Sequence, residues 1–326
     1  GTFNCNSQNQ NFAGDFSLSL GTTYTEGGTL TFDKITTAQT VTDSTAAPGQ
    51  DLGTVTIGPS TATSVSTANK MHVTTLTIGA DDTLDISGDT LTICGTGTPF
   101  SEGGGFTVTG STVVYSGAGA TNITTTQYNN LTFTPESGSA TYSLTGDLTV
   151  ANSAALTGGI NISSNATLDA TATPYSIDLA GNWTVSASGA FEARSGEVTL
   201  SGSGNQTVTA GAADTSHDFF NLTVTNASAS PGVTFADAVK VSNLLKDQTP
   251  NSTLTFTAGT TSYINDVQLT GSAPTNYVVI RSSASSAATW NITVTTLTGV
   301  SYTSLTYNTA TGSGAPFDIS AGNNYD

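Results

Sequence analysis

The densest group of residues that could do chemistry is acidic and lies within one short stretch. It consists of Asp81, Asp82, Asp85 and Asp89. Carboxylate oxygens are the ligands that Ca²⁺ takes, about six to eight at a time, so these aspartates are the calcium candidate of the chain. A glycosidase would instead need two carboxylates held about 5–9.5 Å apart. Asp85 lies between Leu84 and Ile86 in an alternating strand pattern, which predicts that it points to solvent rather than into a catalytic site.

The basic residues and histidines form no recognisable catalytic set. Lys and Arg together number 6 and are scattered along the chain. His72 and His217 are the two histidines, and neither belongs to a spacing such as HExxH, so no zinc site is predicted around them. We find no nucleophile elbow and no Walker loop. The sequence therefore predicts no catalytic residue, no enzymatic activity and no cofactor apart from the calcium candidate.

Two cysteines, Cys5 and Cys94, bear on the compartment of the protein. In an exported protein they would fit one disulfide, tying the N-terminal end to the first repeat. Two free buried thiols are the alternative. The chain starts at Gly1 and shows no leader pattern, and we interpret it as a mature product whose targeting segment has been removed.

The overall charge excludes some partners. Asp and Glu number 23, and the formal net charge is −17. Such a surface repels nucleic acid, whose binding depends on Lys and Arg contacts to phosphates. No apolar stretch of about twenty residues exists, so we expect no membrane-spanning helix. Charged residues make up only 9% of a chain that also holds 35 glycines, a composition typical of a β-rich extracellular protein.

Matching phrases recur along the chain at steps of about 85 residues. The clearest pairs are Ser116–Gly119 with Ser201–Gly204, Asn165–Leu168 with Asn251–Leu254 and, two periods apart, Gln39–Val41 with Gln206–Val208. The repeats define units at 28–110, 111–195 and 196–280, with a partial unit at 281–326 and a separate segment at 1–27. A finer echo of 35 residues relates Gly146–Val150 to Gly181–Val185.

Within each phrase, apolar residues alternate with Thr or Asp. Leu91 and Ile93 are one such pair, and Val198 and Leu200 are another. This period of two, interrupted by Gly, Asn and Ser, predicts short half-buried strands. Residues 241–246 are the only weak candidate for helical spacing, and we expect a loop there.

Two all-β architectures fit such strands. Tandem Ig-like sandwiches have units of about 100 residues with seven strands each. A β-solenoid stacks short strands in coils of about 20–30 residues. The 35-residue echo favours the solenoid, and so does the scarcity of charge, because like charges facing each other across stacked strands are destabilising. We therefore predict a right-handed parallel β-helix, with tandem sandwiches as the alternative. In it, Trp183 would be a core residue, because it takes the place of Leu148 in the echo.

Several phrases also resemble a known class of repeat. YNNLTF, GNWTVSASGAF and GEVTLSGSGNQTV are similar to the degenerate repeats of large bacterial surface proteins with β-helical passenger or stalk regions. That class includes adhesins of the filamentous-haemagglutinin and autotransporter kind. The resemblance lies in repeat style and covers roughly residues 28–310. It implies a secreted, non-enzymatic, structural or adhesive protein at the cell surface.

Export makes glycosylation relevant to the Asn-x-Ser/Thr sites. The candidates are Asn122, Asn182, Asn251 and Asn291.

For function, we expect a subunit of an extracellular polymer, such as a fibre, sheath or surface layer, whose main partner is another copy of itself. An adhesin stalk or a module that binds surface polysaccharide is the alternative, ahead of a polysaccharide-active enzyme or a phage fibre. The residues expected to mediate assembly are Phe12, Phe16, Leu18 and Leu20. They alternate with polar residues as a strand would, and this strand would either complete a neighbour's sheet or fold back to cap its own solenoid.

Overall fold

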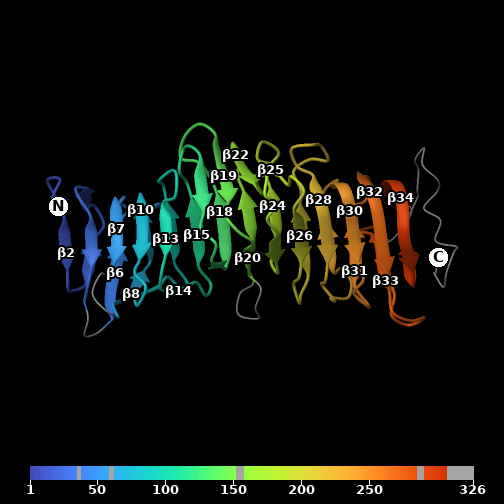
Figure 1. Ribbon diagram of the computed structural model, residues 1–326, viewed down its shortest axis with the longest axis horizontal. Coiled ribbons are helices and arrows are strands. Elements are labelled where there is room, and N and C mark those ends of the chain that lie inside the picture. Colours follow the sequence, from blue (N-terminus) through green and yellow to red (C-terminus); the bar gives the residue numbers. More distant parts are fainter. Residues whose placement is uncertain (35–37, 59–61, 152–157, 285–289, 307–326) are drawn as a thin grey trace. The chain divides into compact units, whose positions relative to one another are not determined.

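The computed structural model describes residues 1–34, 38–58, 62–151, 158–284 and 290–306. Throughout these ranges the chain forms short strands without any helix, and successive coils stack with their strands parallel (Figure 1). The predicted β-solenoid is confirmed. The chain divides into two compact units, Gly1–Thr145 and Gly146–Asp326, which are described separately.

In the first unit the coil visits three sides in turn. One sheet contains β2 (Gln10–Phe12), β5 (Leu30–Phe32), β7 (Thr54–Ile57), β10 (Thr75–Ile78) and β13 (Phe100–Glu102). A second contains β3 (Phe16–Leu18), β6 (Gln39–Asp43), β8 (Ser64–Ala68), β11 (Thr83–Asp85) and β14 (Gly105–Thr107). The third contains β9 (Lys70–Val73), β12 (Thr90–Ile93), β15 (Thr112–Tyr115) and β18 (Asn130–Phe133). Two further pairs are β1 (Thr2–Asn4) with β4 (Thr23–Thr25) and β16 (Thr121–Ile123) with β19 (Ala140–Leu144), and β17 spans Gln127–Tyr128.

The second unit begins with three sides and continues with two. One sheet contains β21 (Ile160–Ile162), β24 (Trp183–Val185), β27 (Gln206–Thr209), β29 (Val233–Phe235), β31 (Thr253–Phe256), β33 (Val278–Ser282) and β35 (Thr303–Thr306). Another contains β20 (Leu148–Val150), β23 (Ile177–Leu179), β26 (Glu197–Leu200), β28 (Phe219–Val224), β30 (Lys240–Asp247), β32 (Thr261–Thr270) and β34 (Asn291–Ser301). The pair β22 (Ala166–Asp169) and β25 (Ala190–Glu192) makes the third side. After β26 the chain alternates between the two long sheets, and the strands lengthen to 10 residues in β32 and 11 in β34.

The repeating structural element is one coil. Val113 pairs with Leu91 of the preceding coil and with Leu131 of the following one. In the second unit, Val208 pairs in the same way with Phe235 of the next coil. The steps in sequence between these partners are close to the coils of about 20–30 residues expected for a solenoid. The 35-residue echo, in contrast, relates β20 to β24, which lie in different sheets. The echo therefore relates strands of similar sequence, each with its following corner, that lie on different sides of the coil. The boundaries of the 85-residue units stay a prediction.

Inward side chains form stacks that run from coil to coil. Trp183 is 1% exposed, as predicted for a core residue. In the second unit the rings of Phe235, Phe256 and Trp290 stack with centroids 4.6 Å apart at each step. On the outer face, Thr75 donates a hydrogen bond from its hydroxyl to that of Thr54 at 3.1 Å. Threonine can stack in register because its hydroxyls pair while its methyl groups pack.

A buried glutamine ties a corner to the preceding coil at two places. Gln39 is 0% and Gln206 is 1% exposed. Each donates two hydrogen bonds from Nε2 to backbone carbonyls of the coil before it, which are Phe12 and Gly14 for Gln39 and Leu179 and Gly181 for Gln206. The recurrence of Gln-Thr-Val in the sequence therefore has a physical basis, since both copies build the same corner.

Residues 1–27 start the solenoid itself. Asn11 in β2 pairs with Thr31, and Ser17 in β3 pairs with Thr42. Phe16 and Leu18 are buried in the first coil and Phe12 is half-buried, whereas Leu20 is 81% exposed. The segment thus pairs with its own chain and forms the first coil. A role of this segment in assembly stays a prediction.

Candidate functional site

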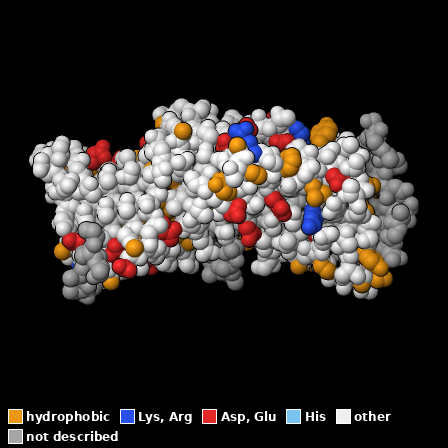
Figure 2. All heavy atoms as spheres, in the orientation of Figure 1, with side chains coloured by type: hydrophobic (Ala, Val, Ile, Leu, Met, Phe, Trp, Pro, Cys, Tyr) orange, Lys and Arg blue, Asp and Glu red, His pale blue; other side chains and the backbone are white. Residues whose placement is uncertain are grey.

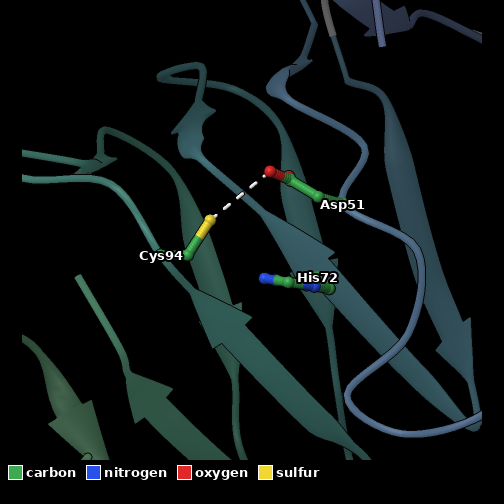
Figure 3. Close-up of side chains that lie close together, drawn as sticks. All are labelled: Asp51, His72 and Cys94. Atoms are coloured by element: carbon green, nitrogen blue, oxygen red, sulfur yellow. Dashed lines mark hydrogen bonds between the residues drawn. The ribbon is translucent and has the colours of Figure 1, made fainter. Parts of the chain in front are cut away.

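Three side chains of different chemistry lie close together in the first unit (Figure 3). They are Asp51, His72 and Cys94, and one ligand atom of each lies within 4.8 Å of the others. Within the described ranges, this is the one group of three or more His, Cys, Asp or Glu side chains arranged to hold a metal ion. We call it the Asp–His–Cys cluster.

The coil brings these residues together by stacking. His72 follows the buried Met71 in β9 and points outward, because side chains alternate along a strand. It pairs with Asp51 of the preceding coil and with Thr92 of the next. Cys94 lies two positions after Thr92, so it is on the same face. Neighbouring strands lie about 4.8 Å apart, which accounts for the distances between the three side chains.

His72 has two different surroundings at its two ring nitrogens. Nδ1 lies 3.4 Å from the carbonyl oxygen of Gly49, and a carbonyl only accepts, so Nδ1 carries the proton in this contact. Nε2 is buried and lies 3.3 Å from Oε1 of Glu136, in a geometry that makes no hydrogen bond. The whole residue is 7% exposed.

The other two members contact each other directly. Cys94 donates from Sγ to Oδ2 of Asp51 at 3.5 Å, and the same carboxylate oxygen accepts from the Thr74 hydroxyl at 2.9 Å. Burial raises the pKa of the Cys94 thiol to about 12, a hydrogen bond with Thr74 acts in the opposite direction, and the charges of Asp51 and Glu136 raise it further. In these surroundings the thiol is protonated at neutral pH unless a cation takes the place of its proton.

A groove lies beside the cluster on the same face of the first unit. Its volume is about 570 Å³. Side chains of β9, β12 and β15 and of two flanking loops line it, among them Lys70, Thr90, Thr92, Val114, Pro48 and Glu136. The groove therefore offers a cation, a carboxylate and hydroxyl groups to a ligand.

Of the four aspartates of the calcium candidate, Asp81 and Asp82 share the corner before β11, Asp85 ends β11, and Asp89 lies in the corner after it. Asp82 is 3% exposed, whereas Asp81 is exposed. Three of these carboxylates accept a hydrogen bond from a backbone N–H group. The donor is Thr63 for Asp82, Ser87 for Asp85 and Asn69 for Asp89. These contacts stabilise turns, and in the part of the chain that the structure describes the four carboxylates form no group suited to an ion. Figure 2 likewise shows scattered acidic side chains and few basic ones on the face that it displays.

The predicted disulfide is absent, and both cysteines are free. Cys5 follows β1 in the first coil and donates from Sγ to the Tyr24 hydroxyl at 3.2 Å. Cys94 follows β12. Three coils lie between Cys5 and Cys94, and they contain β4, Asp51 and β9 in that order. Four coil spacings amount to about 19 Å. A disulfide needs Cα atoms about 4.4–6.8 Å apart, so the two cysteines cannot bridge in this fold.

The glycosylation candidates differ in exposure. Asn182 and Asn251 are exposed, whereas Asn122 and Asn291 are half-buried. Asn122 donates from Nδ2, the atom that would carry a glycan, to the Thr98 hydroxyl at 3.0 Å. Modification of these sites stays a prediction, and the two exposed asparagines are the more accessible.

Sequence reasoning missed the Asp–His–Cys cluster. No ligand spacing in the sequence surrounds His72, yet the fold brings Asp51 and Cys94 to it, so the expectation of no zinc site there stays open. His217 has Asp214 at 2.7 Å from Nδ1 and, among the described residues, no third ligand. Its one trace in the sequence is the nearly even spacing of its three members, which is one coil at each step and has meaning only once the coil length is known.

Comparisons with protein-family models, with curated proteins and with solved structures find no match to this chain. The β-solenoid agrees with the repeat style noted in the sequence, and it names no family. Within the described ranges, no helix is long and apolar enough to cross a membrane.

Proposed function

We propose that this chain is a structural, non-enzymatic, secreted protein that forms an extracellular polymer by joining its coils end to end. The supporting observation is the first coil. Its strands β1, β2 and β3 pair with β4, β5 and β6 on one side, and no described strand lies on their other side. Such open edges template further strand pairing unless they are protected.

The backbone of the first coil shows which groups face the open side. Gln10 donates its N–H to the carbonyl of Thr29, and the carbonyl of Phe12 accepts from Asp33. Because backbone groups alternate along a strand, the N–H and C=O of Asn11 point away from the solenoid. In β3 the carbonyl of Leu18 accepts from Ser44, so the groups of Ser17 point away in the same manner.

The first coil lacks basic residues and proline, two of the usual protections of an edge, although its strands β1, β2 and β3 are only 3 residues long each. Natural edge strands carry Lys, Pro or bulges that prevent pairing. Residues 1–27 contain no Lys, Arg or Pro. Among the described residues, two of the four exposed large apolar side chains lie here, with Phe3 37% and Leu20 81% exposed, and the Phe3 ring stacks on Tyr24 at 5.8 Å. A neighbouring subunit that covered this coil would bury these surfaces.

A binding module, either an adhesin stalk or a carbohydrate-binding protein at the cell surface, is the second candidate. The groove beside β9, β12 and β15 favours it, since Lys70, Glu136 and the threonine hydroxyls could hydrogen-bond a polysaccharide. Glycan-array binding that Thr92→Val weakens would support this candidate, and the absence of any bound glycan would count against it.

Sedimentation velocity tests the polymer with two matched pairs of substitutions. Asn11→Pro with Ser17→Pro removes two N–H donors that face the open side, and Asn11→Ala with Ser17→Ala keeps them. We expect the wild type and the alanine variant to associate as concentration rises, and the proline variant to stay monomeric with an unchanged circular dichroism spectrum. A wild type that is monomeric throughout, or a proline variant that assembles like it, would contradict the proposal.

A further inference from the structure

We propose that the Asp–His–Cys cluster binds a divalent transition metal ion of the zinc class. Thiolate sulfur and imidazole nitrogen are ligands that Zn²⁺ and Co²⁺ take readily, whereas Ca²⁺ and Mg²⁺ take oxygen. Asp51, His72 and Cys94 supply one atom each of oxygen, nitrogen and sulfur. This inference does not depend on polymer formation.

The strongest support is the buried imidazole of His72. Nδ1 faces the carbonyl of Gly49, so in the neutral imidazole the proton lies on Nδ1 and Nε2 keeps its lone pair. Nε2 is buried with no hydrogen-bond partner, and its neighbour at 3.3 Å is the carboxylate of Glu136, which when ionised only accepts. A metal-bound histidine commonly donates its second N–H to a carbonyl, as His72 does. A cation beside Nε2 would satisfy both the lone pair and the carboxylate.

The distances suit a tetrahedral site. Zinc bonds of about 2.0–2.3 Å place neighbouring ligand atoms roughly 3.3–3.8 Å apart. Cys94 Sγ and Asp51 Oδ2 are already 3.5 Å apart, and all three ligand atoms lie within 4.8 Å of one another. Closure therefore needs side-chain adjustments of about 1 Å. Water would take the fourth position, and Glu136, 3.3 Å from Nε2 of His72, is a further carboxylate beside the site.

Charge and topology indicate a structural role for the ion. Binding transfers the thiol proton of Cys94 to solvent, and the thiolate and the Asp51 carboxylate then balance the two positive charges of the metal. The three ligands come from three successive coils. A bound ion would hold these coils together, and its binding free energy would add to the stability of the folded chain.

Cobalt titration tests the site, because the chain provides its own controls. The full-length protein, reduced with a phosphine, would be titrated with Co²⁺ while the sulfur-to-cobalt absorption and the visible bands of tetrahedral Co²⁺ are recorded. The variants are Cys94→Ser and His72→Asn, and the matched controls are Cys5→Ser and His217→Asn. We expect one Co²⁺ per chain in the wild type and both controls, displacement by Zn²⁺ but not by excess Ca²⁺, and at least about tenfold weaker binding in the two cluster variants.

Thermal unfolding with and without Zn²⁺ gives a second readout that needs no colour. The midpoint is expected to rise with Zn²⁺ in the wild type and in Cys5→Ser, and to stay constant in Cys94→Ser. Absence of a tetrahedral Co²⁺ spectrum in the wild type would overturn the proposal. Equal loss of binding in the cluster variants and their controls would do the same.

Discussion

Single buried polar groups hold corners of this solenoid, and Asp247 is one whose charged form is disfavoured by burial. It is 0% exposed, and its carboxylate accepts from the Ser252 hydroxyl at 2.7 Å and the Thr249 N–H at 2.9 Å. Burial raises its pKa to about 6, although these hydrogen bonds act in the opposite direction. The folded state therefore holds this proton more tightly than the unfolded state does.

The free energy of unfolding should consequently depend on pH at this residue. A folded pKa above the unfolded value means that stability is lost as pH rises from about 4 to about 6, and is constant above that. Asp247→Asn keeps the shape and removes the charge. The free energy of unfolding of the variant, relative to that of the wild type, should rise by on the order of 2–3 kcal/mol from pH 4 to pH 8, because the pKa of Asp247 differs by about two between the folded and unfolded states. Urea unfolding at both pH values measures this gain, and an equal difference at the two would contradict it.

The two corner glutamines give a second prediction at this scale. Oε1 of Gln206 accepts from the N–H of Gly202 and from Asn226, whereas Oε1 of Gln39 has no partner in the described structure. Gln206→Met leaves more buried groups unpaired and should cost about 2–4 kcal/mol, and Gln39→Met should cost less. Urea midpoints rank the two variants. A Gln39 variant that is equally or more destabilised would show that the corners are held by something else.

At the scale of elements, the sequence predicted which side chains of a strand point inward better than it predicted which strands pair with one another. Alternation places Leu91 and Ile93 inward, and both are fully buried in β12. The loop expected at 241–246 is wrong, because these residues belong to β30 and pair with β32. A register shift between Val241 and Leu244 breaks the alternation, which hid the strand.

The Asp–His–Cys cluster could not be predicted for a related reason. Its members become neighbours only if the coil length is known, and neither the 85-residue step nor the 35-residue echo equals one coil. The coil length also varies because the corners differ. The step from Val113 to its partner Leu131 is shorter than the step from Val208 to its partner Phe235. Alternation reports which face a residue occupies, whereas register depends on the corners between strands.

Strand position predicts how proline is tolerated. Thr31 in β5 pairs with Asn11 on one side and Thr56 on the other, whereas Asn11 pairs on one side only. Thr31→Pro must lose a ladder hydrogen bond and should cost about 3 kcal/mol or more, while Asn11→Pro should cost less than about 1 kcal/mol. Thermal melts followed by circular dichroism compare the two. Equal destabilisation would mean that β2 is not an edge strand in solution.

At the scale of the whole molecule, charge opposes the proposed assembly. Each chain carries a formal net charge of −17, so subunits repel one another at low ionic strength. The Debye length falls from about 30 Å at 0.01 M to about 8 Å at 0.15 M salt, which screens this repulsion. Assembly through strand edges should therefore increase with salt. Light scattering across a salt series measures this, and dissociation by salt would indicate an ion-paired interface instead.

Electron microscopy of the purified full-length protein tests the central claim most directly. Joining of coils end to end predicts unbranched filaments one molecule wide at physiological salt, formed by the wild type and by the Asn11→Ala, Ser17→Ala variant. The Asn11→Pro, Ser17→Pro variant should show separate particles under the same conditions. Separate particles in the wild type at every concentration and salt, or filaments that persist in the proline variant, would contradict the account.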